Sequence, residues 1–105
     1  MINHAVIVKD DFIVSQEIEY IYEGQLTVQC NAILKAFLAS RQSEVEGGIL
    51  FVTGCPGLTS VSLIIAAKLS KVVYNREPAD SDEMCAIELL RERGIETVCN
   101  PSIIL

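Results

Sequence analysis

The stretch from Ile49 to Tyr74, ILFVTGCPGLTSVSLIIAAKLSKVVY, decides the fold. It begins with a continuous apolar run, Ile49 to Thr53, which is typical of a strand buried on both faces. The tight turn Gly54-Cys55-Pro56-Gly57 follows it, and the pattern from Leu58 to Leu69 predicts a mostly buried helix. Lys71 to Tyr74 predicts a second short strand. A strand, a helix and a strand in this order indicate an α/β domain with a right-handed crossover.

The chain after this unit repeats the pattern. Asp80 or Ser81 can cap a helix that runs to Arg93, and Gly94 is placed to end that helix. Ile95 to Cys99 then predicts the last strand.

The chain before the unit predicts a β-hairpin and one more helix. His4 to Lys9 and Phe12 to Ile18 are the two strands of the hairpin, and the turn signal Asp10-Asp11 joins them. Residues 19–26 are polar and predict a loop. Apolar residues from Val28 to about Ala39 follow the spacing of one helix face, with Thr27 as the N-cap.

The predicted fold is a three-layer α/β/α sandwich, with the element order β-β-α-β-α-β-α-β. Its mixed five-stranded sheet carries helices on both faces. The 105 residues form one domain, residues 1–105, because two independent cores would not fit in a chain of this length.

Composition excludes several classes of partner. Fourteen acidic residues against 8 basic ones give a formal charge of −6, so free nucleic acid is not an expected partner. No apolar run is long enough to cross a membrane, and the N-terminus has no secretory signal pattern. The four cysteines show no CxxC pair, so we expect buried free thiols in a cytoplasmic protein.

Two segments together resemble the zinc-dependent cytidine/deoxycytidylate deaminase family. Residues 27–34, TVQCNAIL, stand where the first motif helix of that family opens with HAExNAIL. Residues 52–60, VTGCPGLTS, stand where the family has a strand followed by PCxxC, and a Val-Val-Tyr strand comes next in both. The resemblance runs from about Ala5 to Cys99 and implies the deaminase-like fold.

The resemblance also shows what this chain lacks. In the family one His and two Cys hold Zn²⁺, and a Glu moves protons while a metal-activated water replaces the exocyclic amine. The His position is Thr27, the Glu position is Gln29, and the two Cys positions are Gly57 and Ser60. Gly cannot ligate zinc, neutral hydroxyls are poor ligands, and a Gln amide cannot shuttle protons. We therefore expect no zinc and no other cofactor, in a pseudoenzyme with a binding, regulatory or assembly role.

We expect the pocket at the position of the family's metal site to hold water. The more specific alternative is that this pocket binds an anion or a nucleotide. If both motif helices still point their N-termini at it, hydroxyls and backbone N–H groups would line it. The residues of this candidate binding site are Thr27, Gln29, Asn31, Thr53, Thr59 and Ser60.

A second hypothesis is an active enzyme, either a nucleoside or nucleotide deaminase or another hydrolase. It would use an atypical site built on Cys30 and Cys55, with His4 as the one histidine available to it. In this hypothesis a nearby helix N-terminus activates Cys55 by lowering its pKa. A third hypothesis is a small nucleotide-binding regulatory module.

The chain is also expected to associate with itself, most simply as a dimer. The helix from Leu58 to Leu69 is apolar nearly all round and needs cover on more than one side. The family usually carries a helix before the hairpin, and this chain starts at the hairpin, which leaves one sheet face less covered.

Overall fold

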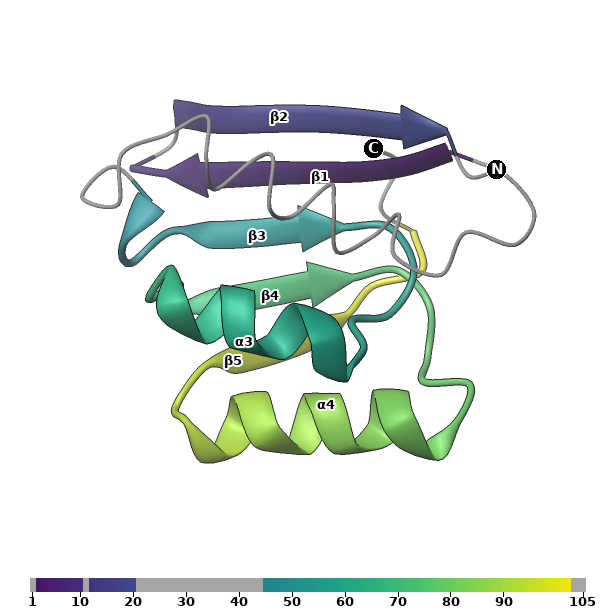
Figure 1. Ribbon diagram of the computed structural model, residues 1–105. Coiled ribbons are helices and arrows are strands. Elements are labelled where there is room, and N and C mark those ends of the chain that lie inside the picture. The colour runs from purple at the N-terminus through teal and green to yellow at the C-terminus, as the bar shows by residue number, and fades with distance from the viewer. Residues whose placement is uncertain (1, 11, 21–44, 103–105) are drawn as a thin grey trace.

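The computed structural model describes residues 2–10, 12–20 and 45–102. In chain order the strands and helices follow one another as in Figure 1. They are β1 (Ile2–Lys9), β2 (Phe12–Tyr20), β3 (Ile49–Val52), α3 (Leu58–Ala66), β4 (Lys71–Tyr74), α4 (Ser81–Glu92) and β5 (Glu96–Cys99).

The five strands form one mixed sheet in the order β2-β1-β3-β4-β5. β1 pairs antiparallel with both β2 and β3, whereas β3, β4 and β5 are parallel. The predicted hairpin and the predicted alternation of strands and helices after it are therefore confirmed. The order from β3 to β5 advances across the sheet in one direction, as successive crossover units do.

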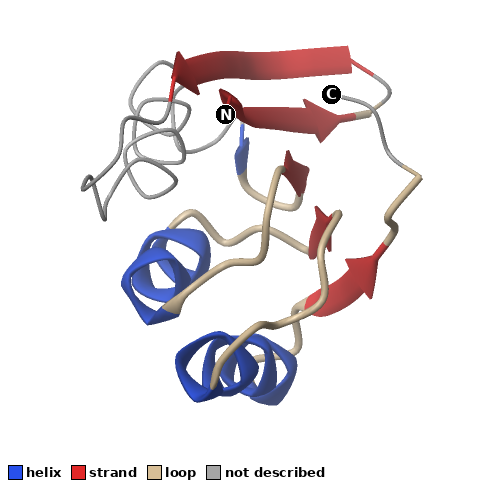
Figure 2. Cartoon of the chain, turned by 90° about the vertical axis from the view of Figure 1, so that its right-hand side faces the viewer, coloured by secondary structure: helices blue, strands red, loops and turns tan. Residues whose placement is uncertain are grey.

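Both described helices lie on the same face of the sheet, side by side (Figure 2). Two right-handed crossovers that advance in the same direction place their helices on the same side. α3 and α4 therefore form one helical layer. The helix predicted from Val28 to Ala39 lies outside the described residues, so the three-layer arrangement stays a prediction.

The hydrophobic core lies between this face of the sheet and the two helices. Leu50 and Val52 of β3 are buried, while Ile49 and Phe51 between them are only half-buried. This alternation shows that β3 turns one side to the core and the other away from the helices. Ile7 of β1, Ile64 of α3 and Leu90 of α4 complete the centre of the core, each at most 1% exposed.

The ends of the elements differ from their predicted bounds for identifiable reasons. α3 ends at Ala66 and not at Leu69, because Lys68 adopts the left-handed conformation, with φ 56°. Leu69 keeps the apolar pattern because its side chain is buried without being helical. β2 continues to Tyr20, so the predicted loop from residue 19 begins too early.

The pairing of β3 with β1 requires the backbone at Gly48, just before β3, to lie close to the backbone of Val45 and of Val8 in β1. A Cβ at this position would lie 2.9 Å from the carbonyl oxygen of Val45 and 3.1 Å from that of Val8. Both are backbone atoms that cannot move away cheaply. Gly48 therefore lets β3 begin against β1.

Within the described ranges, no helix is long and apolar enough to cross a membrane.

Candidate functional site

The candidate site lies at the edge of the sheet where the three parallel strands end. β3, β4 and β5 all have their carboxyl ends there, and α3 and α4 both begin there (Figure 1). Ligands of α/β proteins bind preferentially at this edge. The backbone N–H of Gly54 donates to the side-chain oxygen of Asn75 over 2.7 Å, which ties the end of β3 to the end of β4.

The first turn of α3 carries Gly57 and Ser60, which the sequence resemblance predicts at the positions of the family's zinc cysteines. Gly57 is the N-cap, in extended conformation and without a side chain to cap the helix. The N–H groups of Ser60 and Val61 both donate to the Gly57 carbonyl, over 3.0 and 3.3 Å. Ser60 is 1% exposed, so its hydroxyl lies in the interior beside the helix start.

These two residues do not fit a zinc ion. Gly57 offers no side-chain donor atom, and Ser60 offers a neutral hydroxyl in place of a thiolate. Among the described residues, no group of three or more His, Cys, Asp or Glu is arranged to hold a metal. We derive no chemical step through zinc.

The remaining predicted site residues divide into two groups. Thr53 is half-buried just after β3, and Thr59 is exposed in the first turn of α3, so the structure brings both to the same edge as Ser60. Thr27, Gln29, Cys30 and Asn31 lie outside the described residues, and their part of the predicted pocket stays a prediction.

An acidic side chain that sequence reasoning missed lies at the start of α3. The N–H of Leu58 donates to Oδ2 of Asp82, in the first turn of α4, over 3.3 Å. One feature of the sequence could have predicted this contact. Helices of neighbouring crossovers begin at the same sheet edge, so the first turn of one lies close to the first turn of the other.

An ion pair fixes the loop from which α4 begins. Both guanidinium NH₂ groups of Arg76 donate to the Glu83 carboxylate, over 3.1 and 2.7 Å, and the N–H of Ala79 donates to the same carboxylate over 2.7 Å. Asp80 caps the helix by accepting from the N–H of Glu83 over 2.9 Å. The Arg76 hydrogen bonds lower the pKa of Glu83 below its usual value.

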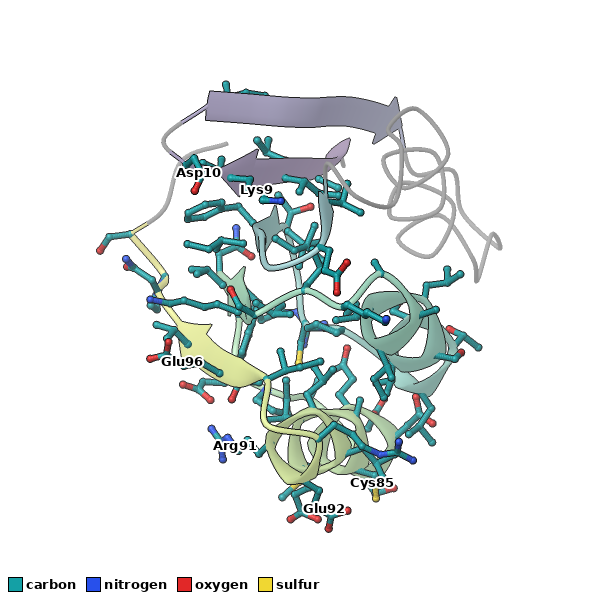
Figure 3. The ribbon with its side chains drawn as sticks, turned by 90° about the vertical axis from the view of Figure 1, so that its left-hand side faces the viewer. Lys9, Asp10, Cys85, Arg91, Glu92 and Glu96 are labelled. Atoms are coloured by element: carbon teal, nitrogen blue, oxygen red, sulfur yellow. The ribbon has the colours of Figure 1, made fainter. Side chains whose placement is uncertain are left out.

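Cys55 is not an activated nucleophile. It is 1% exposed, and its pKa is raised to about 12, first by burial and then by the negative charge of Glu83. The expectation that a helix N-terminus lowers this pKa is wrong, because loss of hydration outweighs the dipole. Of the other described cysteines, Cys99 is half-buried but Cys85 is exposed, so the prediction of buried thiols fails at Cys85, which lies on the outer side of α4 (Figure 3).

A hollow elsewhere on the surface is separate from this edge. It has a volume of about 370 Å³ and lies between the end of α4 and the start of β5. Arg91, Thr97 and Glu96 are among the residues that line it, and Nε of Arg91 donates to the hydroxyl of Thr97 over 2.7 Å; Figure 3 labels Arg91 and Glu96. The opposite charges of Arg91 and Glu96 give the hollow no preference for an anion or a cation.

Solved structures share this fold. Acinetobacter baumannii RibD matches with a TM-score of 0.72 and 22% identity over 93% of this chain. The diaminohydroxyphosphoribosylaminopyrimidine deaminase/5-amino-6-(5-phosphoribosylamino)uracil reductase of Thermotoga maritima matches at 0.68, with 26% identity over 91% of this chain. The chain spans 28% of each of these two proteins.

A smaller protein matches over most of its own length. The dCMP deaminase of cyanophage S-TIM5 gives a TM-score of 0.66 and 22% identity, covering 92% of this chain and 79% of the enzyme. No protein-family model matches the sequence, and no curated protein gives a significant match. The fold is therefore deaminase-like.

Proposed function

We propose that the protein is a deaminase-fold pseudoenzyme that acts through binding and assembly. The observation that supports this proposal is the first turn of α3, where Gly57 is the N-cap and Ser60 is buried, because the sequence resemblance aligns these two residues with the family's zinc cysteines. The thiol of Cys55 supports it, because a pKa of about 12 leaves almost no thiolate at neutral pH. The same property argues against Cys55 as the nucleophile of the alternative enzyme, whose other cysteine, Cys30, lies outside the described residues.

Deamination of dCMP is the direct test. The S-TIM5 dCMP deaminase was solved with dCMP and dUMP, so dCMP is the probe nucleotide. We expect no loss of cytosine absorbance above a mock preparation. A rate proportional to protein concentration would overturn the proposal. The variant Thr27→His, Gln29→Glu, Gly57→Cys, Ser60→Cys is the matched control, and we expect it to gain zinc binding.

A binding role predicts that a nucleotide raises the melting temperature of the wild-type chain. Ligands that bind only the folded state stabilise it in proportion to the logarithm of their concentration. We therefore propose dCMP, cytidine and inorganic phosphate as probes, because together they separate base recognition from phosphate recognition. If none of the three raises the melting temperature, assembly is the remaining role.

We propose that the protein is a homodimer and that α3 takes part in its interface. Leu58 is 40% exposed, and Leu63 and Ile65 on the same helix are only half-buried. Ile64, by contrast, is fully buried in the core. Ile65→Asp should therefore break the dimer, and Leu89→Asp, at a 39% exposed position on α4, is the matched control.

The assay for assembly is sedimentation or light scattering at micromolar concentration. A mass near 11.5 kDa for the wild-type chain would contradict the dimer, and a multiple of that mass supports it. We place the protein in the cytoplasm, where Cys55, Cys85 and Cys99 would stay as thiols.

A further inference from the structure

The side of the sheet that faces away from α3 and α4 carries an apolar surface of its own, which we call the rear face. On the helix side, Ile7, Leu50 and Val72 lie opposite one another in register and belong to the core. Side chains alternate along each strand, so the neighbouring row points the other way. The residues of that row lie on four adjacent strands and are not part of the core: Val6, Phe51, Val73 and Val98.

A second row of residues extends the rear face. It runs from Ile13, which is 63% exposed, through Val8 to Ile49. Lys71 and Glu96 continue the same row on β4 and β5, and their side chains pair over 3.8 Å. Among the described side chains of this face, one positive and one negative charge therefore stand beside a continuous apolar surface.

The handedness of the crossovers predicts that no connecting helix covers the rear face. α3 and α4 lie on the other side (Figure 2). β2 and β3 are also parallel, because each is antiparallel to β1, and the step from β2 to β3 advances across the sheet in the same direction as the steps from β3 to β5. The right-handed rule therefore predicts the connection from β2 to β3 on the helix side. Val45, at the end of that connection, agrees with this prediction because it is fully buried in the core.

The charge of the rear face indicates what covers it. The chain has a formal charge of −6, so two copies repel each other over much of their surface. On the rear face the charges of Lys71 and Glu96 cancel, so two copies approach there with the least repulsion. A neutral apolar face does not attract a strongly basic or acidic partner, whereas it is complementary to itself. We propose that the rear face packs against the rear face of a second copy of this chain.

The rear-face contact goes beyond the dimer proposed through α3, because α3 lies on the opposite side of the sheet. A chain with two different two-fold contacts closes as a tetramer. Five strands spaced about 4.8 Å apart, with about 3.3 Å per residue, give the rear face an area of about 450 Å². Two copies together cover about twice this area, which lies in the range of weak interfaces. The association through this face should therefore depend on concentration.

Sedimentation of a chain that lacks the α3 contact tests the rear face by itself. Ile65→Asp removes the α3 contact, and Leu58→Lys, at a 40% exposed position, replaces it if Ile65→Asp does not fold. We expect the mass of this chain to rise from 11.5 kDa toward twice that value between about 10 and about 500 µM. Adding Phe51→Gln should weaken the association at least about tenfold, because it places an amide in the middle of the apolar row. Adding Leu89→Lys, at a 39% exposed position on α4, is the matched control and should not change it.

Val98→Lys is a second rear-face variant, at a half-buried position of β5, and a cooperative melting transition shows which variants are folded. A mass that stays near 11.5 kDa in the Ile65→Asp chain at the highest concentration would overturn the proposal; this result is expected if residues 103–105 cover the face instead. Equal association of the Phe51→Gln and Leu89→Lys chains would also overturn it. The α3 contact fails separately, if Ile65→Asp leaves the mass of the wild-type assembly unchanged, and the pseudoenzyme proposal fails through deamination of dCMP.

Discussion

The ion pair between Arg76 and Glu83 should carry a measurable part of the stability, and Arg76→Met removes it while keeping an unbranched apolar stem. Two charge-assisted hydrogen bonds join the groups, over 3.1 and 2.7 Å. The Glu83 side chain is 15% exposed but that of Arg76 is 48% exposed, so water screens the interaction on one side. We expect a loss of about 1.5 kcal/mol at neutral pH.

Urea unfolding measures this loss. With an m-value of about 1.5 kcal/mol per molar urea, the midpoint should fall by about 1 M and m should not change. Arg93→Met is the control, because Arg93 is exposed and no hydrogen bond or ion pair of its side chain is found among the described residues. It should move the midpoint by less than about 0.3 M.

The pH dependence of the loss has a definite sign. The pKa of Glu83 is lower in the folded chain than its usual value of 4.5, first because of the Arg76 hydrogen bonds. The stability from this pair is therefore fully present above the usual pKa and is lost as pH falls through the folded pKa. The effect of Arg76→Met should therefore shrink as the pH falls below 4.5 and through the lowered folded pKa of Glu83. An effect that equals that of Arg93→Met, or does not change with pH, would refute the reasoning.

Three further predictions follow from single positions. Iodoacetamide at pH 8 should label the exposed Cys85 quickly and Cys55 only on unfolding, because Cys55 is buried with a raised pKa; mass spectrometry of the peptides decides this, and rapid labelling of Cys55 would contradict it. Lys68→Gly should stabilise the chain by about 0.5 kcal/mol, since Lys68 has φ 56° and its ion pair with Glu46 spans 3.9 Å between exposed side chains; a lower melting temperature would oppose this. Gly48→Ala should cost about 2 kcal/mol, because the added Cβ meets two backbone oxygens, and an unchanged urea midpoint would count against that contact.

Local patterns were sufficient to predict most of the described fold. Apolar runs and turn residues located β3, α3, β4 and α4 to within about three residues, because each pattern reports an element that packs on the core. The end of α3 was predicted three residues too late because Leu69 is buried although it lies outside the helix. An apolar pattern cannot distinguish a buried helical residue from a buried residue that follows the helix. α3 and α4 lie on the same face because the strand order advances in one direction from β3 to β5. The sequence pattern predicts the crossovers but does not specify this strand order.

The candidate site was predictable only in part. Gly57 and Ser60 were located by motif order, and the structure places them in the first turn of α3. Asp82 was not predicted, because its contact with Leu58 joins two helices 24 residues apart in the sequence. The raised pKa of Cys55 was missed for a different reason: the hypothesis of an activated thiol considered the helix N-terminus, whereas burial in the core has the larger effect on this pKa.

The zinc content of the purified protein tests the central proposal most directly. The chain is expressed in zinc-supplemented medium, desalted, and analysed for metal per mole of protein by elemental mass spectrometry. Because the sequence resemblance aligns Gly57 and Ser60 with two of the ligand positions, we expect far less than one zinc per chain. About one zinc per chain, lost in Cys55→Ser or Cys30→Ser, would contradict the proposal and favour an enzyme with an atypical metal site.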